Sequence, residues 1–482
     1  MSRTAVVWFR RDLRLHDHPA LHAAVERFDR VVGLYVLDDA LLAGRWASAN
    51  RTWFLARALD ELGYDLRARD GALAVVRGDP RALVVAFARE TGAEAILASR
   101  DHGPYGRARD DAVASAANAA GIRFLAGRGL LVHEPEDVHR DDGGSYAIFS
   151  PFHRRWRELP IRAILDAPTA VPAPSDVPGA ASDRIQLLLG ETAPTADPDL
   201  LLEPGEAAAR RRLASWAASS ALANYDEGRD RLSVDGTSRL SQDLRWGTLS
   251  AVEVVDRCGG ADPGPTRFRS EIAWRDFYAH LLRHQPRVRR ESYRREFDAV
   301  AWETDQTVIA AWREGRTGYP VVDAAMRQLR ATGWMHNRAR MVAASFLTKH
   351  LGVDWRVGEA EFMAHLVDGD PASNNGGWQW AASTGTDPQP YFRIFNPTMQ
   401  GRRHDPDGDY VRRWVPELAG IDGDAVHEPP PGTYLAPIVE HFGARRRALE
   451  AYASRARIRA DRDDGPDVAL ARDDDVAAPD VR

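Results

Sequence analysis

The chain has 482 residues, of which 44% are hydrophobic and 28% charged, a balance typical of a globular chain of two or three domains. No run of about 18 or more apolar residues is present, so we expect no membrane-spanning helix and no membrane partner. The N-terminus carries arginines within its apolar stretch, unlike a signal peptide. The single cysteine, Cys258, excludes internal disulfides and a cysteine-based zinc site. We therefore predict a cytoplasmic protein, and we expect no metal site.

The net charge of −6 argues weakly against a nucleic-acid partner, but the arginines are unevenly distributed. Nine of them fall between Arg267 and Arg295, opposed by only three acidic residues there and by Glu296 just after. A run of charge is usually a solvated face. Here the aromatic side chains of Trp274, Phe277 and Tyr278 are interleaved with the arginines, which favours a surface for a polyanion.

Strands and helices alternate at the start of the chain. Strands are predicted at 4–9, 31–37, 73–76, 94–98 and 122–125, with helices between them at 19–27, 47–62, 80–91 and 107–120. This alternation predicts a five-stranded parallel sheet with helices on both faces, in an α/β domain of residues 1–128 whose ligands bind at the carboxyl edge of the sheet. No Gly-x-Gly-x-x-Gly follows the first strand, so a dinucleotide site of that kind is not expected.

The composition changes after the sheet. Residues 129–204 are rich in Pro, Asp and Ala and show no periodicity, so we predict an interdomain linker over the surface, anchored by Phe152 and Trp156. Residues 205–456 have a helical pattern throughout, which predicts an all-α domain. Residues 457–482 are acidic and nearly free of aromatics, and we expect them to be disordered.

The stretch 369–397 combines acidic, amide, glycine and tryptophan residues that seldom occur together. Asp370 followed by Pro371 predicts a helix start, with Asp as the N-cap and Pro at the first helical position. Asn374 falls one turn later and shares a helix face with Asp370. The glycine pair at 376–377 is expected to interrupt this helix, since two glycines cost roughly 2 kcal/mol there relative to alanine.

Two tryptophans, Trp378 and Trp380, follow the glycines. Small residues beside large flat side chains let a backbone approach a planar ligand closely. A plain loop with both tryptophans in the core explains the same residues equally well, and the residue types alone do not separate the two interpretations.

A second cluster contains Tyr225 and Arg229, four residues apart, ahead of the segment 235–241, DGTSRLS. Hydroxyl groups and free backbone N–H groups at a helix start form an anion site suited to a phosphate or pyrophosphate. Taken alone, such a segment is more often an ordinary Ser or Thr N-cap.

In SEIAWRDFYAHLL, the residues at i, i+3, i+4 and i+7 share one helix face; they are Glu271, Trp274, Arg275 and Tyr278. A carboxylate, an indole and a guanidinium in line can stack a base, hydrogen-bond its edge and hold a phosphate. The simpler alternative is an exposed helix with an i,i+4 Glu–Arg ion pair.

In GWMHNRARMVAASFL, Asn337 and Met341 lie at i and i+4. Asn is a poor helix former, so an interior Asn suggests a hydrogen-bonding role. His336 has no second ligand at metal-binding spacing, and we expect a polar or core histidine. Met341 by itself is more often a core residue.

The chain resembles the photolyase and cryptochrome family over nearly its whole length, apart from the linker and the acidic tail. The resemblance rests on VVWFRRDLRLHDHPAL near the start and, later, on TSRLS, WRDFY, TGYPVVDAAMRQLRATGWMHNRARM, DWRVGE and DGDPASNNGGWQWAASTGTDPQPYFRIFNPTMQG. It is strongest to the class I cyclobutane pyrimidine dimer photolyases. The family implies a Rossmann-like α/β antenna domain followed by a large all-α FAD-binding domain.

The resemblance also implies roles for single residues. FAD would be held by Tyr225, Thr237, Ser238, Arg239, Leu240, Ser241, Asp368, Gly369, Asp370 and Asn374. The TSRLS segment matches the contacts to the phosphates, and Asn374 matches the residue that faces flavin N5. Plant cryptochromes typically have Asp at that position and animal cryptochromes Cys, so Asn favours a repair enzyme.

Further matched positions concern the lesion, the DNA and electron transfer. Glu271 matches the carboxylate that hydrogen-bonds the damaged pyrimidines, and the other lesion contacts are Trp274, Asn337, Met341 and Trp380. The implied DNA contacts are Arg229, Arg275, Tyr278, Arg338 and Gln400. The (6-4) photolyases carry a His pair of which only His336 is present, which favours the cyclobutane dimer as the lesion. The tryptophan chain between flavin and surface matches Trp378, Trp355 and Trp302.

The implied activity is light-driven repair of damaged DNA by a monomeric enzyme. Photoexcited reduced FAD passes an electron to a flipped-out pyrimidine dimer, the cyclobutane ring splits, and the electron returns. The alternative is a flavin photoreceptor of the cryptochrome type, which signals through partners and repairs nothing.

A second, light-harvesting chromophore is expected in the antenna domain. Folate-binding members have Asn-Glu where this chain has Tyr105-Gly106. The pattern Asp-x-x-Pro-Tyr-Gly-Arg looks more like members that bind an 8-hydroxy-5-deazaflavin, with Asp101 and Arg51 as contacts. Methenyltetrahydrofolate and FMN are less favoured alternatives, and an empty site is also open.

Overall fold

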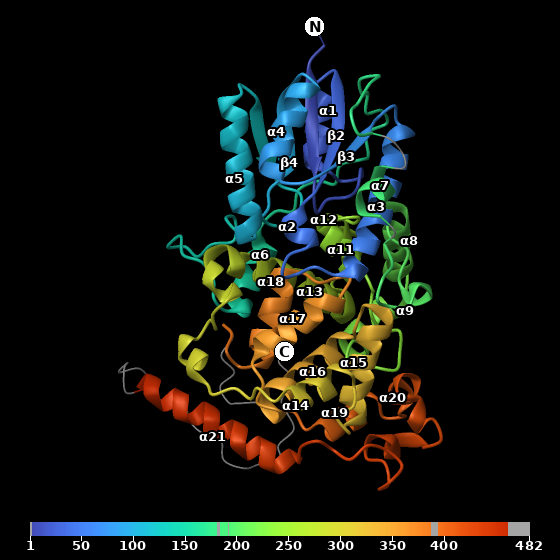
Figure 1. Ribbon diagram of the computed structural model, residues 1–482, viewed down its shortest axis with the longest axis vertical. Helices are drawn as coiled ribbons and strands as arrows, with labels where there is room; N and C mark the ends of the chain where they lie inside the picture. Colours follow the sequence, from blue (N-terminus) through green and yellow to red (C-terminus); the bar gives the residue numbers. More distant parts are fainter. Residues whose placement is uncertain (1, 181–183, 191, 387–393, 461–482) are drawn as a thin grey trace.

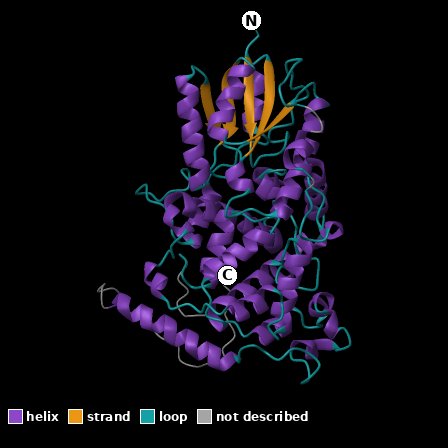
Figure 2. Ribbon diagram, in the orientation of Figure 1, coloured by secondary structure: helices purple, strands orange, loops and turns teal. Residues whose placement is uncertain are grey.

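Five strands form one parallel sheet at the end of the molecule that carries the N-terminus (Figures 1 and 2). The structure is a computed structural model that describes residues 2–180, 184–190, 192–386 and 394–460. The strands lie in the order β3-β2-β1-β4-β5; they are β1 (Thr4–Phe9), β2 (Arg30–Leu37), β3 (Leu73–Arg77), β4 (Ala93–Ser99) and β5 (Arg123–Gly127). The predicted strands and the parallel α/β sheet are confirmed.

Successive residues of β1 enter different cores, because their side chains point to opposite faces of the sheet. Val7 and Phe9 pack with α1 and α3, whereas Val6 and Trp8 pack with α4 and α5. These helices are α1 (Pro19–Arg27), α3 (Ala49–Arg67), α4 (Pro80–Glu90) and α5 (Pro104–Ala119), and the short α2 (Asp39–Leu42) follows β2. The sheet is therefore covered on both faces, as its nearly continuous apolar strands predict.

The segment after the sheet contains helices that the sequence did not reveal. They are α6 (Phe149–Glu158), α7 (Arg184–Leu189) and the 3₁₀ turn η1 (Pro198–Leu200). Phe152 and Trp156 are buried as expected, and Trp156 Nε1 donates to Asp276 Oδ2 at 3.0 Å. The expectation of an irregular linker is wrong for these stretches. In α6 the buried Phe149, Phe152 and Trp156 recur at helical spacing, which the prediction overlooked, whereas α7 and η1 are too short to show periodicity.

The part of the chain described beyond residue 204 is helical between its loops, as predicted for the all-α domain. The α-helices are α8 (Glu206–Ala217), α9 (Ser220–Ala223), α10 (Tyr225–Gly228), α11 (Ser241–Trp246), α12 (Ala251–Arg257), α13 (Pro263–His284), α14 (Gln306–Arg313), α15 (Pro320–Thr332), α16 (Asn337–Ser345), α17 (Trp355–His365), α18 (Pro371–Ala381), α19 (Pro397–His404), α20 (Asp409–Trp414) and α21 (His441–Ala460). Shorter helical turns are η2 (Pro286–Arg289), η3 (Arg295–Ala299), η4 (Phe346–His350), η5 (Pro416–Leu418) and η6 (Gly423–His427).

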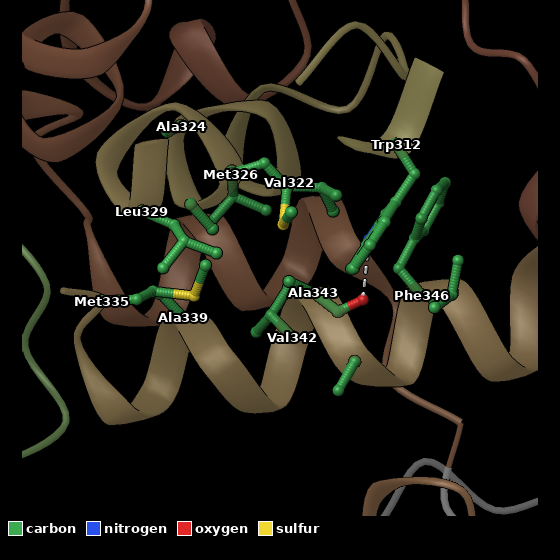
Figure 3. Close-up of a cluster of buried hydrophobic side chains, with 14 of the residues drawn as sticks. Trp312, Val322, Ala324, Met326, Leu329, Met335, Ala339, Val342, Ala343 and Phe346 are labelled. Atoms are coloured by element: carbon green, nitrogen blue, oxygen red, sulfur yellow. Dashed lines mark hydrogen bonds between the residues drawn. The ribbon is translucent and has the colours of Figure 1, made fainter. Parts of the chain in front are cut away.

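The largest core of this helical body lies between α14, α15 and α16 (Figure 3). Trp312 of α14 is fully buried, and its Nε1 donates to the carbonyl oxygen of Ala343 at 3.1 Å. Leu329 of α15 lies close to Met335, just before α16. Burying a large apolar side chain contributes roughly 1.5–3 kcal/mol, so this core gives α16 a rigid backing.

α18 runs without a break through the glycine pair at 376–377, so the expected interruption there is wrong. A Cβ on Gly376 would overlap the ring of Tyr278 on α13, whereas Gly377 is exposed and has open space around it. Close packing of α18 on α13 offsets the poor helix propensity of glycine. The predicted start is confirmed, with Asp370 as the N-cap.

Charged contacts join the sheet domain to the segment that leads into α18. Arg11 Nη2 lies 2.5 Å from Asp370 Oδ2. Arg51 Nη1 on α3 donates to the carbonyl oxygens of Met363 and Leu366, at 2.5 and 2.8 Å. Because α18 carries much of the predicted site, these contacts fix that site relative to the sheet.

Among the described residues, no helix is both long and apolar enough to cross a membrane. The last described element is α21, which lies along the opposite end of the molecule from the sheet (Figure 1). The prediction of a disordered tail falls largely on residues 461–482, which are outside the described part of the chain.

Candidate functional site

Asp370, at the start of α18, has partners for both of its carboxylate oxygens. Asp370 Oδ1 accepts from Ala372 N and Ser373 N, at 3.0 Å each, and its Oδ2 pairs with Arg11. Burial raises the pKa of Asp370, but the nearby Arg11 and Arg245 outweigh it and hold the value at about 2. Asp370 is thus ionised and turned toward the sheet domain.

Asp368, two residues earlier, is only half satisfied. Its Oδ2 accepts from Arg340 Nη2 at 2.7 Å, while its Oδ1 is buried and lacks a hydrogen-bond partner among the described residues. A buried acceptor without a donor costs roughly 1–3 kcal/mol. Asp368 therefore offers the acceptor that a polar cofactor needs.

The predicted phosphate segment leads into α11. Arg239 has a left-handed backbone, with φ of 54°, and a left-handed residue beside right-handed ones turns successive N–H groups toward the same side, where they bind anions. Its guanidinium carbon lies 3.9 Å from the ring centroid of Trp334. Arg239 Nε is buried and lacks a hydrogen-bond partner within the described residues. The segment is consistent with an anion site.

Asn374 and its neighbour are both held by one carboxylate residue on α17. Asn374 Nδ2 donates to the backbone oxygen of Glu359 at 3.0 Å, and Asn375 Nδ2 donates to the Glu359 side chain at 2.9 Å. Burial raises the pKa of Glu359 to about 7. Sequence reasoning missed Glu359, because it is one of several charged residues of α17 and its spacing gives no signal.

An alternating charge network joins α10, α13 and α16. Glu271 of α13 forms an ion pair with Arg229, which directly follows α10. Arg338 of α16 lies 2.6 Å from Asp230, whose other carboxylate oxygen is 3.7 Å from Arg229. Three residues predicted to contact the lesion or the DNA are therefore brought together, and Asp230, which was not predicted, links them.

Two predicted aromatic walls line one cavity between α13 and α18. Trp274 and Trp380 both border it, with Tyr278, Tyr293 and Gln379 among the other lining residues. Both tryptophans are half-buried. Trp274 is fixed by a face-to-face stack on Phe149 of α6, with ring centroids 3.7 Å apart. The cavity thus presents flat rings to a ligand that enters from solvent.

Arg275 does not share the direction of its neighbours on α13. It donates to the carbonyl oxygens of Leu130 and Leu244, at 2.9 and 3.1 Å. Leu130 belongs to the segment that leaves the sheet, so Arg275 lies on the side of α13 that faces the domain boundary. The single-face interpretation is therefore wrong for Arg275. Glu271 does not pair with Arg275 either; besides Arg229, its i,i+4 partner is Arg267, at 3.6 Å.

Asn337 is the first residue of α16, so the prediction of an interior Asn is wrong. His336 is the N-cap, and its Nδ1 accepts from Arg338 N at 3.1 Å. Asn337 Nδ2 lies 3.9 Å from Met341 Sδ, so these two predicted lesion contacts are adjacent. Gln400, on α19, has a buried Oε1 without a hydrogen-bond partner among the described residues.

The predicted tryptophan chain begins in α18 and passes to α17. Trp378 and Trp355 are buried. The indole of Trp378 lies against Gly358 of α17, where a Cβ would overlap the ring. Glycine at 358 therefore allows the contact between the two helices.

Glu303, which follows Trp302, donates from its backbone N to Gly352 O at 2.8 Å, just before α17. Trp378 and Trp355 lie in one hydrophobic core, and Trp302 packs against it. Sequence reasoning missed Trp312, whose ring centroid lies 6.1 Å from that of Trp378. A buried tryptophan in an amphipathic helix looks like a core residue.

A second cavity lies at the domain boundary, beside the carboxyl end of the sheet. Among its lining residues are Arg11, Asp101, His102, Arg275 and Asp370. Although burial opposes ionisation, Arg11 and Arg109 hold the pKa of Asp101 well below its usual range. Arg51, the other predicted antenna contact, does not line this cavity, since backbone carbonyls engage its guanidinium. The structure thus separates these two residues.

Comparison with known families agrees with this arrangement. Residues 5–175 match the family described as DNA photolyase, and residues 268–454 match the FAD binding domain of DNA photolyase. The chain is therefore a two-domain flavoprotein. It belongs to the photolyase and cryptochrome family, which confirms the resemblance. The match to an FAD binding domain supports FAD as the cofactor.

Curated relatives cover almost the whole chain. A deoxyribodipyrimidine photo-lyase of Agrobacterium fabrum is 40% identical over 474 residues, which cover 93% of this chain and 97% of the relative. One of Streptomyces griseus is 43% identical over 443 residues, 88% of this chain and 92% of the relative. The similarity is therefore not confined to a single domain.

Solved structures share the fold. A bacterial class III photolyase from Agrobacterium tumefaciens has a TM-score of 0.89 and 39% identity, covering 95% of this chain and 98% of its own. An archaeal photolyase from Sulfolobus tokodaii, described with two FAD molecules, has a TM-score of 0.82 and 31% identity over 94% of this chain and 100% of its own. A Synechocystis cryptochrome has a TM-score of 0.84 and 28% identity over 93% and 99%. The predicted fold class is confirmed.

Proposed function

We propose that this chain is a deoxyribodipyrimidine photo-lyase, which uses light to split cyclobutane pyrimidine dimers in DNA. The observation that carries the proposal is the aromatic cavity between Trp274 and Trp380, with Glu271 one turn from Trp274 on the same helix. The curated relatives with that name, at about 40% identity over nearly the full chain, support it.

The buried polar atoms fit a bound FAD. Asp368 has an unpaired oxygen and Arg239 an unpaired nitrogen within the described residues, and polar groups of the cofactor would satisfy both. Arg239 with Thr237 and Ser238 would hold the phosphates, and Asp368 and Asn374 would lie nearer the ring system. When bound and reduced, FAD supplies an excited electron donor.

The other predicted cofactor residues play supporting parts in this proposal. Leu240 and Ser241 join the phosphate segment to α11, and Tyr225 is buried beside it in α10. Asp370 is bound to Arg11 at the domain boundary, so its part is to start α18 and thereby place Asn374. Gly369 accepts a hydrogen bond from Arg245 at 2.8 Å, which fixes the turn before the helix.

The chain's own groups would bind and orient the dimer. The ion pair with Arg229 fixes the Glu271 carboxylate before the substrate arrives, and this preorganisation lowers the cost of orientation. Trp274 and Trp380 would stack on the extruded bases, each worth roughly 1–3 kcal/mol. A damaged pair is already weakened, so flipping it out of the duplex costs less than flipping an intact pair.

Contacts to the DNA strand are proposed for Arg229, Arg338, Tyr278 and Gln400, with Asn337 and Met341 at the edge of the lesion. Arg229 and Arg338 already stand in one network, which can exchange an acidic partner for a phosphate. Arg275 is engaged by two carbonyl oxygens at the domain boundary and is not part of this proposal.

The packing of half-buried Trp302 against the core that holds Trp355 and Trp378 supports a path for electrons that reduce the cofactor. Trp302 is half-buried, whereas the other two are buried, so only the outer end of the path meets solvent. The rate of photoreduction of a Trp355→Phe variant tests this path, and a rate equal to that of the wild type would remove Trp355 from it.

A second chromophore of the 8-hydroxy-5-deazaflavin class is the antenna that we propose, ahead of methenyltetrahydrofolate and FMN. A Cβ at Gly106 would overlap the carboxylate of Asp101, which Arg11 and Arg109 hold in place. The Glu that folate-binding members have at this position therefore does not fit. The absorption spectrum and mass of the chromophore released on denaturation test the assignment, and a released folate would refute it.

Light-driven repair is the test of the main proposal. Purified, reduced protein is mixed with a thymine-dimer oligonucleotide under near-UV light, with a dark control. We expect dimer loss only in the light, strongly reduced in Glu271→Ala and unchanged in Glu227→Ala, an exposed glutamate of α10. Bound flavin without repair would contradict the lyase activity and support the photoreceptor alternative. The similarity to a cryptochrome structure is the observation that favours this alternative.

A monomer in the cytoplasm is the remaining part of the proposal. The only cysteine, Cys258, is buried, and burial raises the pKa of its thiol to about 12, so it is unsuited to an intermolecular disulfide. Light scattering at micromolar concentration tests the monomer, and a mass of two chains would overturn it.

A further inference from the structure

Three side chains of metal-ligand type lie together near the carboxyl end of the sheet, away from the proposed repair site. His102 stands between β4 and α5, and Glu134 and Glu136 stand in the segment that leaves β5. One ligand atom from each lies within 4.8 Å of the others. His102 and Glu134 are 5% and 3% exposed, whereas Glu136 is at the surface.

The buried members of this group have unsatisfied polar atoms. Both ring nitrogens of His102 and Glu134 Oε2 are buried and lack a hydrogen-bond partner among the described residues. His102 Nε2 and Glu134 Oε2 lie 3.3 Å apart and face one another. Buried polar groups in native proteins are nearly always paired, so these atoms point to a missing partner.

We propose that His102, Glu134 and Glu136 bind one divalent transition-metal ion, and that Zn²⁺ fits best. Imidazole nitrogen and carboxylate oxygen are ordinary zinc ligands, and three protein ligands with one water give four-coordination. Sequence reasoning expected no metal, because it excluded only cysteine ligands and because residues 102 and 134 are too far apart to form a spacing motif.

Two arginines stand close to the carboxylates. Arg100 Nη1 lies 3.7 Å from Glu134 Oε2, and Arg283 Nε donates to Glu136 Oε1 at 2.9 Å. The Arg283–Glu136 pair is open, with side chains 28% and 39% exposed, and such an ion pair is worth about 1 kcal/mol or less. A divalent ion therefore displaces Arg283 at small cost and adds a closer positive charge to the buried Glu134 than Arg100 does, and the exposed Glu136 can turn to complete the site.

The neighbouring histidine is not a fourth ligand. One ring nitrogen of His280 lies 3.1 Å from the carbonyl oxygen of Pro135, and the other accepts from Tyr146 N at 3.1 Å. Both nitrogens are therefore engaged, which leaves the fourth position to water.

An ion here would join two parts of the fold. His102 belongs to the sheet domain, whereas Glu134 and Glu136 lie on the segment that enters the helical body and touches α13 through Arg283. A ligand that binds only the folded state stabilises it, so the ion would raise the unfolding temperature.

The test uses the full chain with its flavin, freed of metal by a chelator and then titrated with ZnCl₂ in a calorimeter. We expect one ion per chain, and an unfolding temperature that rises with zinc. Glu136→Gln should weaken zinc binding at least tenfold. Because Glu136 is exposed, this substitution is not expected to prevent folding. His102→Ala should abolish binding at the same site.

The matched control is His22→Ala, a half-buried histidine 3.5 Å from Glu26 on α1 that is outside this cluster. It should bind zinc as the wild type does. Zinc binding that is absent, or equal in wild type and Glu136→Gln, would overturn the proposal. If His102→Ala does not fold, Glu136→Gln alone decides. None of these measurements depends on light-driven repair, so the zinc-site proposal and the photo-lyase proposal can each fail without the other.

Discussion

The helix pair α13 and α18 carries charged residues on two sides, one at the domain boundary and one beside the aromatic cavity, and their surroundings differ. On the boundary side, defined by Arg11, Arg275 and Asp370, partly buried charges are paired with one another or with backbone groups. On the open side, defined by Glu271, Trp274 and Trp380, the carboxylate is paired and similarly exposed, at 26%, but it stands beside half-buried rings. Paired charge that links two domains makes a fixed joint, whereas paired charge beside flat rings at a cavity is available to a ligand.

The largest effect is expected on the boundary side, from Arg11→Gln. It leaves the Asp370 carboxylate without its closest cation and should lower the free energy of unfolding by about 3 kcal/mol, the lower end for a broken buried pair because Arg11 is partly exposed. Urea unfolding measures this loss. Arg257→Gln, an exposed arginine on α12, should change stability by less than about 0.5 kcal/mol. Equal stability of the two variants would show that the boundary side is not a fixed joint.

Acid should destabilise the folded chain through His336, which caps α16. Burial lowers the pKa of His336 to about 4, so the unfolded chain takes up the proton first as pH falls. The stability that depends on the neutral ring is full above about pH 6.5 and is lost as pH falls toward 4, amounting to about 2 kcal/mol at pH 5.

His336→Asn keeps an N-cap side chain without a titrating group. Its free energy of unfolding should therefore fall about 2 kcal/mol less than that of the wild type between pH 7.5 and 5. Parallel pH profiles for the two proteins would exclude this role of His336.

The glycine pair gives the closest matched comparison. Gly376→Ala places a methyl group against the ring of Tyr278 and should destabilise the protein by about 1–3 kcal/mol. Gly377→Ala meets open space and should stabilise it by about 0.5–1 kcal/mol through helix propensity. Thermal unfolding of both variants distinguishes them. A shift of the unfolding temperature in the same direction for both would mean that packing against α13 is not the reason for glycine at position 376.

Local patterns in the sequence predict the sheet domain well, because each strand and helix is long, periodic and bounded by turn residues. α1 begins and ends at the predicted residues, Pro19 and Arg27. The same logic overlooked α6, although its buried Phe149, Phe152 and Trp156 recur at helical spacing, and wrongly interrupts α18. In α18 the contact with α13 decides the outcome, and no local pattern records it.

The site is predicted residue by residue only through the family resemblance. Spacing alone grouped Arg275 with Glu271, whereas in the structure the Arg275 side chain lies at the domain boundary. It also gave no sign of Glu359 or Asp230, whose partners lie far away in sequence. Charge networks between helices depend on tertiary packing, so only coordinates reveal them.

The most direct measurement of the central claim compares Trp380→Ala with Trp414→Ala, a half-buried tryptophan of α20 outside the aromatic cavity. Binding of a thymine-dimer oligonucleotide in the dark and its repair in near-UV light are measured for each variant and the wild type. We predict that Trp380→Ala binds the dimer at least about tenfold more weakly, as loss of one stacking ring implies. It should repair correspondingly less at low protein concentration, while Trp414→Ala matches the wild type. Wild-type affinity and repair in Trp380→Ala would contradict the account.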